Sequence, residues 1–286
     1  MSGTVAAFFG FKDEEEKESD LIIAIKRGVL SVQRNEYQKA EQHFHLALRM
    51  AQTVKNQLAE TYIFDLMGNL AYESSDLDKA EKLFVEVIQR LMIHEKAAED
   101  DIRLLHISTK IAHIAYLKND LEKAMLGFEF VLERIEKKEY LKDDNLYELW
   151  GLVKNFLGQA YISLNQNEKA RQALLDAQKI FIKYKEENSE DGMVLLNNLS
   201  VCHAELKEFG KAEKYLQQAM EIAKELKLED ISPYQINLGM LYLKQKLIEK
   251  AQVQCRAAWQ IAKKNENEEA LTGAEKCLDQ VKAALS

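Results

Sequence analysis

The stretch LDKAEKLF at residues 77–84 decides the fold, because its pattern returns five more times along the chain. Each copy places a lysine directly before an alanine, with an apolar residue four positions after that alanine. The other copies are YQKAEQHF (37–44), LEKAMLGF (121–128), NEKARQAL (167–174), FGKAEKYL (209–216) and IEKAQVQC (248–255). Successive alanines stand 39 to 46 residues apart. A period of this length is typical of an array of stacked repeats.

Each repeat can be read outward from this landmark alanine. The landmark alanines are Ala40, Ala80, Ala124, Ala170, Ala212 and Ala251. Twelve residues earlier the chain always has a small residue, namely Gly28, Gly68, Ala112, Gly158, Ser200 and Gly239. Apolar residues recur at the landmark and four and seven positions after it, which is one face of a helix. Small residues let a second helix approach closely, so each repeat is predicted to be a helix hairpin.

Short polar segments separate the two predicted helices of each hairpin. Asp76 and Asp120 are placed to cap the helix that follows, and Ser232 is predicted to be a cap with Pro233 in the first turn. The chain has one proline and 11 glycines in 286 residues, so it has few helix breakers. We therefore expect only helices, with a closing helix over residues 268–285.

The repeat resembles the tetratricopeptide repeat, and GQAY (158–161) and GMLY (239–242) match that pattern best. This chain departs from the tetratricopeptide pattern in two ways. Its period is longer than about 34 residues, and the proline usually found at the end of the second helix is absent. The resemblance implies an all-α, right-handed superhelical solenoid of about six hairpins with a C-terminal capping helix. We expect a flexible acidic segment at 1–19, then one domain over 20–286 with repeats at about 20–56, 57–97, 101–140, 145–186, 189–228 and 231–265.

Composition narrows the classes of function. The formal net charge of −8 argues against nucleic-acid binding, because such proteins usually carry a basic face. No run reaches the roughly 18 apolar residues that cross a bilayer, although a short apolar patch occupies residues 5–11. The three cysteines, Cys202, Cys255 and Cys277, form no CxxC pair. We expect a reducing compartment, or at least no disulfide framework.

The sequence offers no catalytic constellation. It contains no glycine-rich phosphate loop, no GxSxG and no HExxH. His106 and His113 lie seven residues apart on one helical face, roughly 10 Å along the axis, which is too far for one zinc ion. We therefore expect no enzyme activity, no cofactor and no metal.

The first helices of stacked hairpins usually line a groove. Side chains at matching positions of these helices are mostly amides and aromatic rings, which can hold the backbone of an extended peptide. The alternative is that they are solvated or pair with neighbouring helices. The candidate groove residues are Asp65, Asn69, Tyr72, His106, Lys110, His113, Asn155, Gln159, Asn197, Asn198 and Asn237.

Two segments of the N-terminal half carry a narrower resemblance. ESDLIIAIKRGVLSVQRNEYQKAEQHFHLALRMA (18–51) and TYIFDLMGNLAYESSDLDKAEKLF (61–84) resemble the mitochondrial tetratricopeptide repeat protein 19 family. The run from Tyr62 to Ala71 is the most specific part. The resemblance extends more weakly through the later repeats to about residue 285.

That resemblance implies a non-enzymatic factor on the matrix side of the mitochondrial inner membrane. Its expected partners are subunits of respiratory complex III, including the Rieske protein, whose fragments it would help to clear. Membrane association is expected only through a segment that is missing or truncated here. The alternatives are a cytosolic scaffold or cargo adaptor resembling kinesin light chains, or a role in cell division.

Overall fold

Every regular element in the described part of the chain is an α helix. The structure is a computed structural model, and it describes residues 19–136, 144–184 and 188–285. Within these ranges it has 13 helices and no strand. This confirms the predicted all-α repeat solenoid. The expected acidic segment at 1–19 falls, apart from residue 19, outside the described residues.

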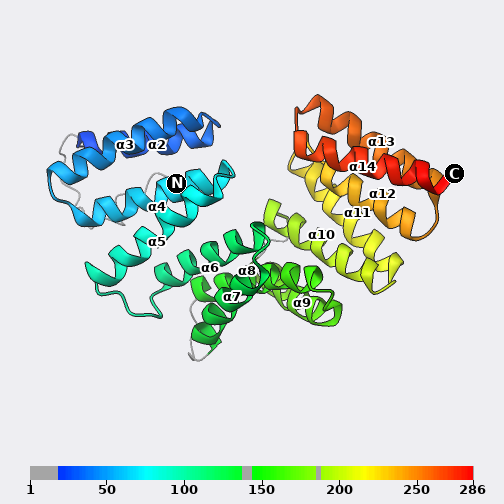
Figure 1. Cartoon of the computed structure of the whole chain (residues 1–286), viewed down its shortest axis with the longest axis horizontal. Helices are drawn as coiled ribbons and strands as arrows, with labels where there is room; N and C mark the ends of the chain where they lie inside the picture. Colours follow the sequence, from blue (N-terminus) through cyan, green and yellow to red (C-terminus); the bar gives the residue numbers. More distant parts are fainter. Residues whose placement is uncertain (1–18, 137–143, 185–187, 286) are drawn as a thin grey trace. The chain divides into compact units, whose positions relative to one another are not determined.

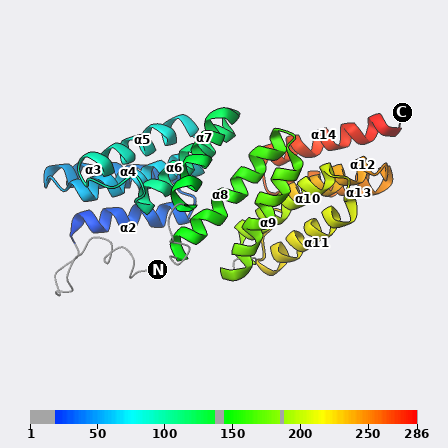
Figure 2. The same ribbon diagram turned by 90° about the horizontal axis from the view of Figure 1, so that it is seen from below.

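The chain separates into two compact units between Arg134 and Ile135, inside helix α7. The helices that begin in the first unit stand as hairpins in chain order (Figures 1 and 2). They are α2 (Asp20–Gln33), α3 (Tyr37–Thr53), α4 (Gln57–Glu73), α5 (Leu77–Ile93), α6 (Ile102–Leu117) and α7 (Leu121–Glu136).

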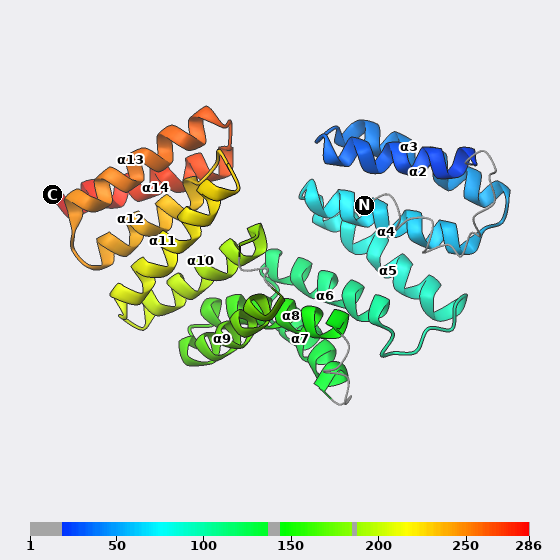
Figure 3. The same ribbon diagram turned by 180° about the vertical axis from the view of Figure 1, so that it is seen from behind.

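The second unit continues the same arrangement and ends with an unpaired helix. Its helices are α8 (Asp144–Ser163), α9 (Asn167–Tyr184), α10 (Glu190–Glu205), α11 (Phe209–Glu225), α12 (Ser232–Lys244), α13 (Ile248–Lys264) and α14 (Glu268–Leu285). Helix α14 packs against both α12 and α13 (Figure 3). Six hairpins and a closing helix were predicted, and both are confirmed.

The small residue of each first helix packs against the bulky residue of its partner helix. A Cβ added to Gly68 would lie 2.7 Å from the ring of Phe84, and one added to Gly158 would lie 2.5 Å from Leu174. The landmark alanines are completely buried. Because interiors are packed as densely as crystals, these contacts set the distance between the two helices.

Most helices end in a turn with one residue of positive φ, which the sequence analysis did not predict. The second residue after the helix, or the third after α5, is in the left-handed conformation, which usually favours glycine. No glycine stands there: the residues are Asn35, Lys55, Ser75, Lys96, Asn119, Asn165, Lys207, Lys227, Lys246 and Glu266. The next amide closes the turn, as where Glu36 N–H donates to the carbonyl of Ser31 at 2.9 Å. Glycine counts therefore understate the turns of this chain.

The lysine before the landmark alanine joins successive hairpins in the first unit. Lys79 bonds Glu41, and Lys123 bonds Glu81, each acceptor being the residue after the preceding landmark alanine. Lys118 also donates to Glu81, at 3.0 Å. These lysines hold the pKa values of Glu41 and Glu81 below the usual range. In these two repeats the recurring lysine therefore ties its own hairpin to the preceding one.

The predicted helix caps are partly correct. Asp76 accepts from the amide of Lys79 at 3.2 Å, and Asp120 accepts from that of Lys123 at 3.1 Å. The predicted cap at Ser232 is wrong, because Ser232 is itself the first residue of α12. Its amide donates to Asp230 at 3.0 Å. The carboxylate two residues earlier thus takes the capping role.

A disulfide joins the last hairpin to the closing helix. Cys255 of α13 and Cys277 of α14 are bonded, and they stand 22 residues apart in the chain. Our expectation that the cysteines form no disulfide framework is wrong for this pair, because the two cysteines meet only when α14 packs onto α13. Cys202 is a buried free thiol, and burial raises its pKa to about 11.

We predict that the oxidised chain, unfolded in denaturant without reductant, exposes one thiol to an alkylating reagent, that of Cys202. Reduction should expose three and lower the free energy of unfolding by about 3 kcal/mol, through the loss of a short closed loop. Mass spectrometry after alkylation counts the thiols. Three reactive thiols before reduction would contradict the bond.

We predict opposite effects for two glycine substitutions. Gly68→Ala should lower the free energy of unfolding by about 1–3 kcal/mol, because Phe84 is fully buried and cannot move aside. Gly210→Ala should raise it by up to about 1 kcal/mol, because nothing lies within 4 Å of the added Cβ and alanine favours helix. Urea unfolding followed by circular dichroism measures both, and shifts of the same sign would contradict the packing argument.

Candidate functional site

A cavity of about 300 Å³ lies in the first unit between α4, α5 and α6. Its walls come mainly from the first helices of the second and third hairpins, α4 and α6. The apolar lining residues are Leu58, Val87, Leu91 and Ile107. The polar lining residues are Thr61, Tyr62, Asp65, Glu95, Arg103, His106 and Lys110. The site is therefore apolar at its base and carries polar groups around it.

Lys110 of α6 bridges to α4 across one edge of the cavity. Its ammonium donates to Asn69 Oδ1 at 2.7 Å and stands 3.6 Å from Asp65 Oδ1. It also lies 5.1 Å from the centre of the Phe84 ring. Asp65 Oδ1 itself is buried and has no hydrogen-bond donor. The edge thus holds a carboxylate oxygen whose hydrogen-bonding capacity is unused.

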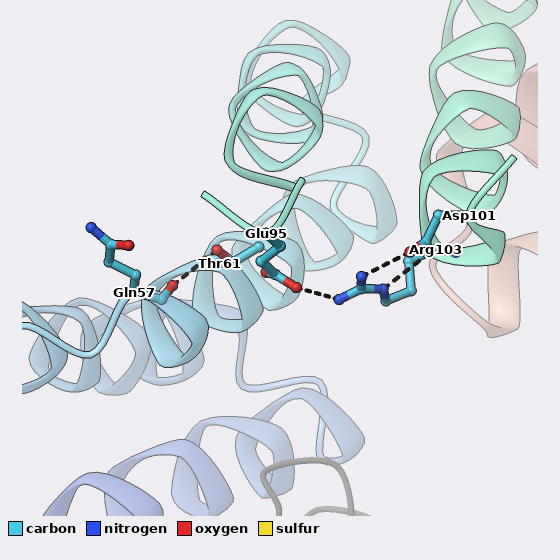
Figure 4. A network of polar contacts seen from close by, with 5 residues as sticks. All are labelled: Gln57, Thr61, Glu95, Asp101 and Arg103. Atoms are coloured by element: carbon cyan, nitrogen blue, oxygen red, sulfur yellow. Dashed lines mark hydrogen bonds and ion pairs between the residues drawn. The ribbon is translucent and has the colours of Figure 1, made fainter. Parts of the chain in front are cut away.

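An ionic network forms another part of the wall (Figure 4). Asp101 caps α6 by accepting from the amide of Arg103 at 2.9 Å, and its second oxygen accepts from the guanidinium at 2.8 Å. The same guanidinium donates to Glu95 at 2.5 Å. Arg103 holds the pKa of Asp101 below its usual range. This network ties the segment after α5 to the start of α6.

Two imidazole rings of α6, those of His106 and His113, are partly buried. Burial, together with the Lys110 ammonium, holds the pKa of His106 below its usual value. Two turns further on, His113 shares a hydrogen bond through Nδ1 with the Tyr72 hydroxyl of α4, and it stacks on Tyr116 with centroids 5.8 Å apart. Burial lowers the pKa of His113 to about 4 and raises that of Tyr72 to about 12. Both imidazoles are therefore neutral near pH 7.

The predicted residues of the second unit bond mostly to one another. Asn198 donates to Asn155 at 2.9 Å, and both are buried, so the prediction that these two side chains line a groove is wrong. Asn237 donates to Asn197 at 2.7 Å, and both are half-buried. Gln159 is half-buried in α8. Here the amides join successive hairpins, as the alternative interpretation held.

The structure brings three of the eleven predicted residues, Asp65, His106 and Lys110, to the cavity wall. Asn69 reaches its edge through Lys110. Sequence reasoning missed Glu95 and Arg103. Glu95 lies outside the helices, after α5 ends, so no repeat position marks it. The available signal was Asp101 at the N-cap position of α6, followed by Arg103 in the first turn of that helix.

The charged groups of the cavity are paired with one another. Within residues 19–136, 144–184 and 188–285, no group of three or more histidine, cysteine, aspartate or glutamate side chains is placed to hold a metal ion. Among the helices of those same ranges, none is long and apolar enough to cross a membrane. The charged groups of the cavity already have ionic partners, which leaves shape, apolar surface and one free acceptor for a ligand.

Comparisons with known proteins identify the family and the fold. Residues 149–225 match the tetratricopeptide repeat family. The chain is 40% identical to the mitochondrial tetratricopeptide repeat protein 19 homolog of Drosophila melanogaster, over 97% of this chain and 76% of that protein. It is 28% identical to the Rattus norvegicus protein, over 80% of this chain and 66% of that one. A Rap protein complexed with competence and sporulation factor shares the fold, with a TM-score of 0.68 at 17% identity over 96% and 78% of the two chains.

We predict that His113 makes stability depend on pH. Its pKa is about 4 when folded and about 6.5 ordinarily, so between these values only the unfolded chain binds the proton. The contribution is fully present above pH 6.5 and is lost as the pH falls toward 4, by up to about 3 kcal/mol. Hydrogen exchange of α4 and α6 at several pH values measures it. His113→Gln should reduce this dependence and leave the part that His106 contributes, whereas the exposed His94→Gln should leave all of it. Equal profiles for all three proteins would refute the assignment.

Proposed function

The chain belongs to the tetratricopeptide repeat protein 19 family, and from this we propose that it is a mitochondrial protein-interaction factor that associates with respiratory complex III. Support for the location comes from relatives that are named mitochondrial, one of them 40% identical over 97% of this chain. Support for binding comes from the repeat fold and from the cavity of the first unit. The role is one of holding protein segments.

In this proposal the protein works on the matrix side of the inner membrane and supports the upkeep of complex III. It would do so by clearing fragments of the Rieske subunit. The observation that carries the proposal is the position of the most family-like stretch, Tyr62 to Ala71. That stretch lies in α4, and Tyr62 and Asp65 within it line the cavity.

The geometry of α4 and α6 suits an extended protein segment. Asn69 and Lys110 together present an amide and an ammonium at the edge of the cavity. Such groups bond a peptide backbone without requiring a particular side chain. The apolar base would then accept whichever side chain the segment turns inward, so that affinity comes from a few buried contacts.

We predict that Asp65→Ala with Asn69→Ala weakens retention of complex III at least fivefold while helicity and melting temperature stay nearly unchanged. Both side chains are half-buried and Lys110 remains partly exposed, so their loss costs little stability. The tagged full chain is used to capture complexes from gently solubilised mitochondria. Intact complexes are then resolved by size.

A matched control removes the same chemistry from the second helix of the same hairpin. Asp78 pairs with Lys118, and Gln89 is exposed on α5, so Asp78→Ala with Gln89→Ala also deletes an ion-paired carboxylate and an amide. The control should retain complex III. Enrichment of cytosolic or cytoskeletal proteins instead of complex III by the unaltered chain would favour the adaptor alternative. A fall in melting of many degrees for the α4 variant would make its residues structural.

A further inference from the structure

The cavity of the first unit contains one polar atom whose need for a partner is unmet. Asp65 Oδ1 is buried and accepts no hydrogen bond, and the nearest cation, Lys110 Nζ, is 3.6 Å away. A buried acceptor left without a donor is unfavourable, because it has lost its hydrogen bonds to water and gained none in exchange. The Asp65 side chain as a whole is 28% exposed, so a ligand with a donor can reach its carboxylate and supply a hydrogen bond that the free protein lacks.

The charges around the cavity argue for a neutral ligand. A second cation at Asp65 would stand close to the Lys110 ammonium, and like charges at such distances repel. An anion would meet Asp65 and Glu95, while the guanidinium of Arg103 is already engaged by Glu95 and Asp101. The ion pairs of the wall thus leave no net attraction for a charged head group.

The size and base of the cavity favour an aromatic ring. A volume of about 300 Å³ is twice the roughly 150 Å³ of an engineered apolar cavity that holds benzene. Val87, Leu91 and Ile107 supply buried apolar surface, and Leu58 is exposed at the opening. Indole and phenol side chains have an apolar body and a polar N–H or O–H at one end, which matches this layout.

We propose that this cavity is an anchor pocket for one neutral aromatic side chain with a hydrogen-bond donor, tryptophan or tyrosine, on a bound protein segment, with Asp65 accepting from it. The inference rests on the proposed function as a binder of protein segments and specifies what that segment carries. Asp65 then has the role of selecting the donor, and the apolar base that of holding the ring.

The test uses the full chain and two pairs of small probes. Indole is compared with 1-methylindole, and phenol with anisole, because each pair shares its ring and differs in the donor. Binding is followed through the methyl NMR signals of Leu58, Val87 and Ile107. We expect at least one donor probe to bind about tenfold more tightly than its methylated partner, the effect of one hydrogen bond to a charged acceptor. Asp65→Ala should abolish that preference, and Asp78→Ala should keep it.

Equal binding of both members in each pair, shifts confined to other methyl groups, or a preference that survives Asp65→Ala would overturn the anchor pocket. The outcome is independent of complex III, since no partner is present. A donor preference combined with failed capture of complex III would leave the pocket standing and remove the proposed partner. Successful capture of complex III without a donor preference would support the proposed partner and overturn the anchor pocket.

Discussion

The close contact between a small residue of the first helix and a bulky residue of the second is the constraint on which the other features depend. In the second hairpin no side chain fits between Gly68 and the Phe84 ring, so the two helices are held at one distance. Phe84 also lies beneath the ammonium of Lys110, which comes from the next hairpin. The packing inside one hairpin thus positions the side chain that bonds to Asn69 and borders the cavity.

Contacts between hairpins follow a second rule, which is polar. Residues next to the landmark alanine reach the neighbouring hairpin, as in Glu41 with Lys79, Glu81 with Lys123 and Glu213 with the Tyr242 hydroxyl at 2.7 Å. Exposed pairs of this kind contribute little each. These pairs instead determine orientation, because they fix which surface of one hairpin meets the next. The apolar contacts between the helices supply most of the free energy of folding.

The sequence predicted the hairpins because each depends on local spacing that repeats six times. It could not predict the bond between Cys255 and Cys277, because that pairing depends on how α14 packs on α13, and no spacing encodes it. The turn residues in the left-handed conformation, such as Lys207 and Asn165, were not predicted for another reason. Composition rules expect glycine at these positions. Ser232 was misassigned because Asp230, two residues earlier, competes for the same capping position.

For the site, repeat position identified the correct helix face but could not tell a free polar group from a satisfied one. Asn198 and Lys110 occupy the same position, fourteen residues before a landmark alanine, yet their environments differ. Asn198 and Asn155 are both amides, so each can meet the other's needs, and they are buried together.

Lys110 has donors only, and Asn69 takes one of them, which leaves an oxygen of Asp65 without a hydrogen bond. Unmet hydrogen-bonding capacity beside an apolar cavity is what a ligand can use, whereas a closed amide pair offers little. This difference in partner chemistry, rather than any difference in fold, makes the first unit the stronger candidate for recognition.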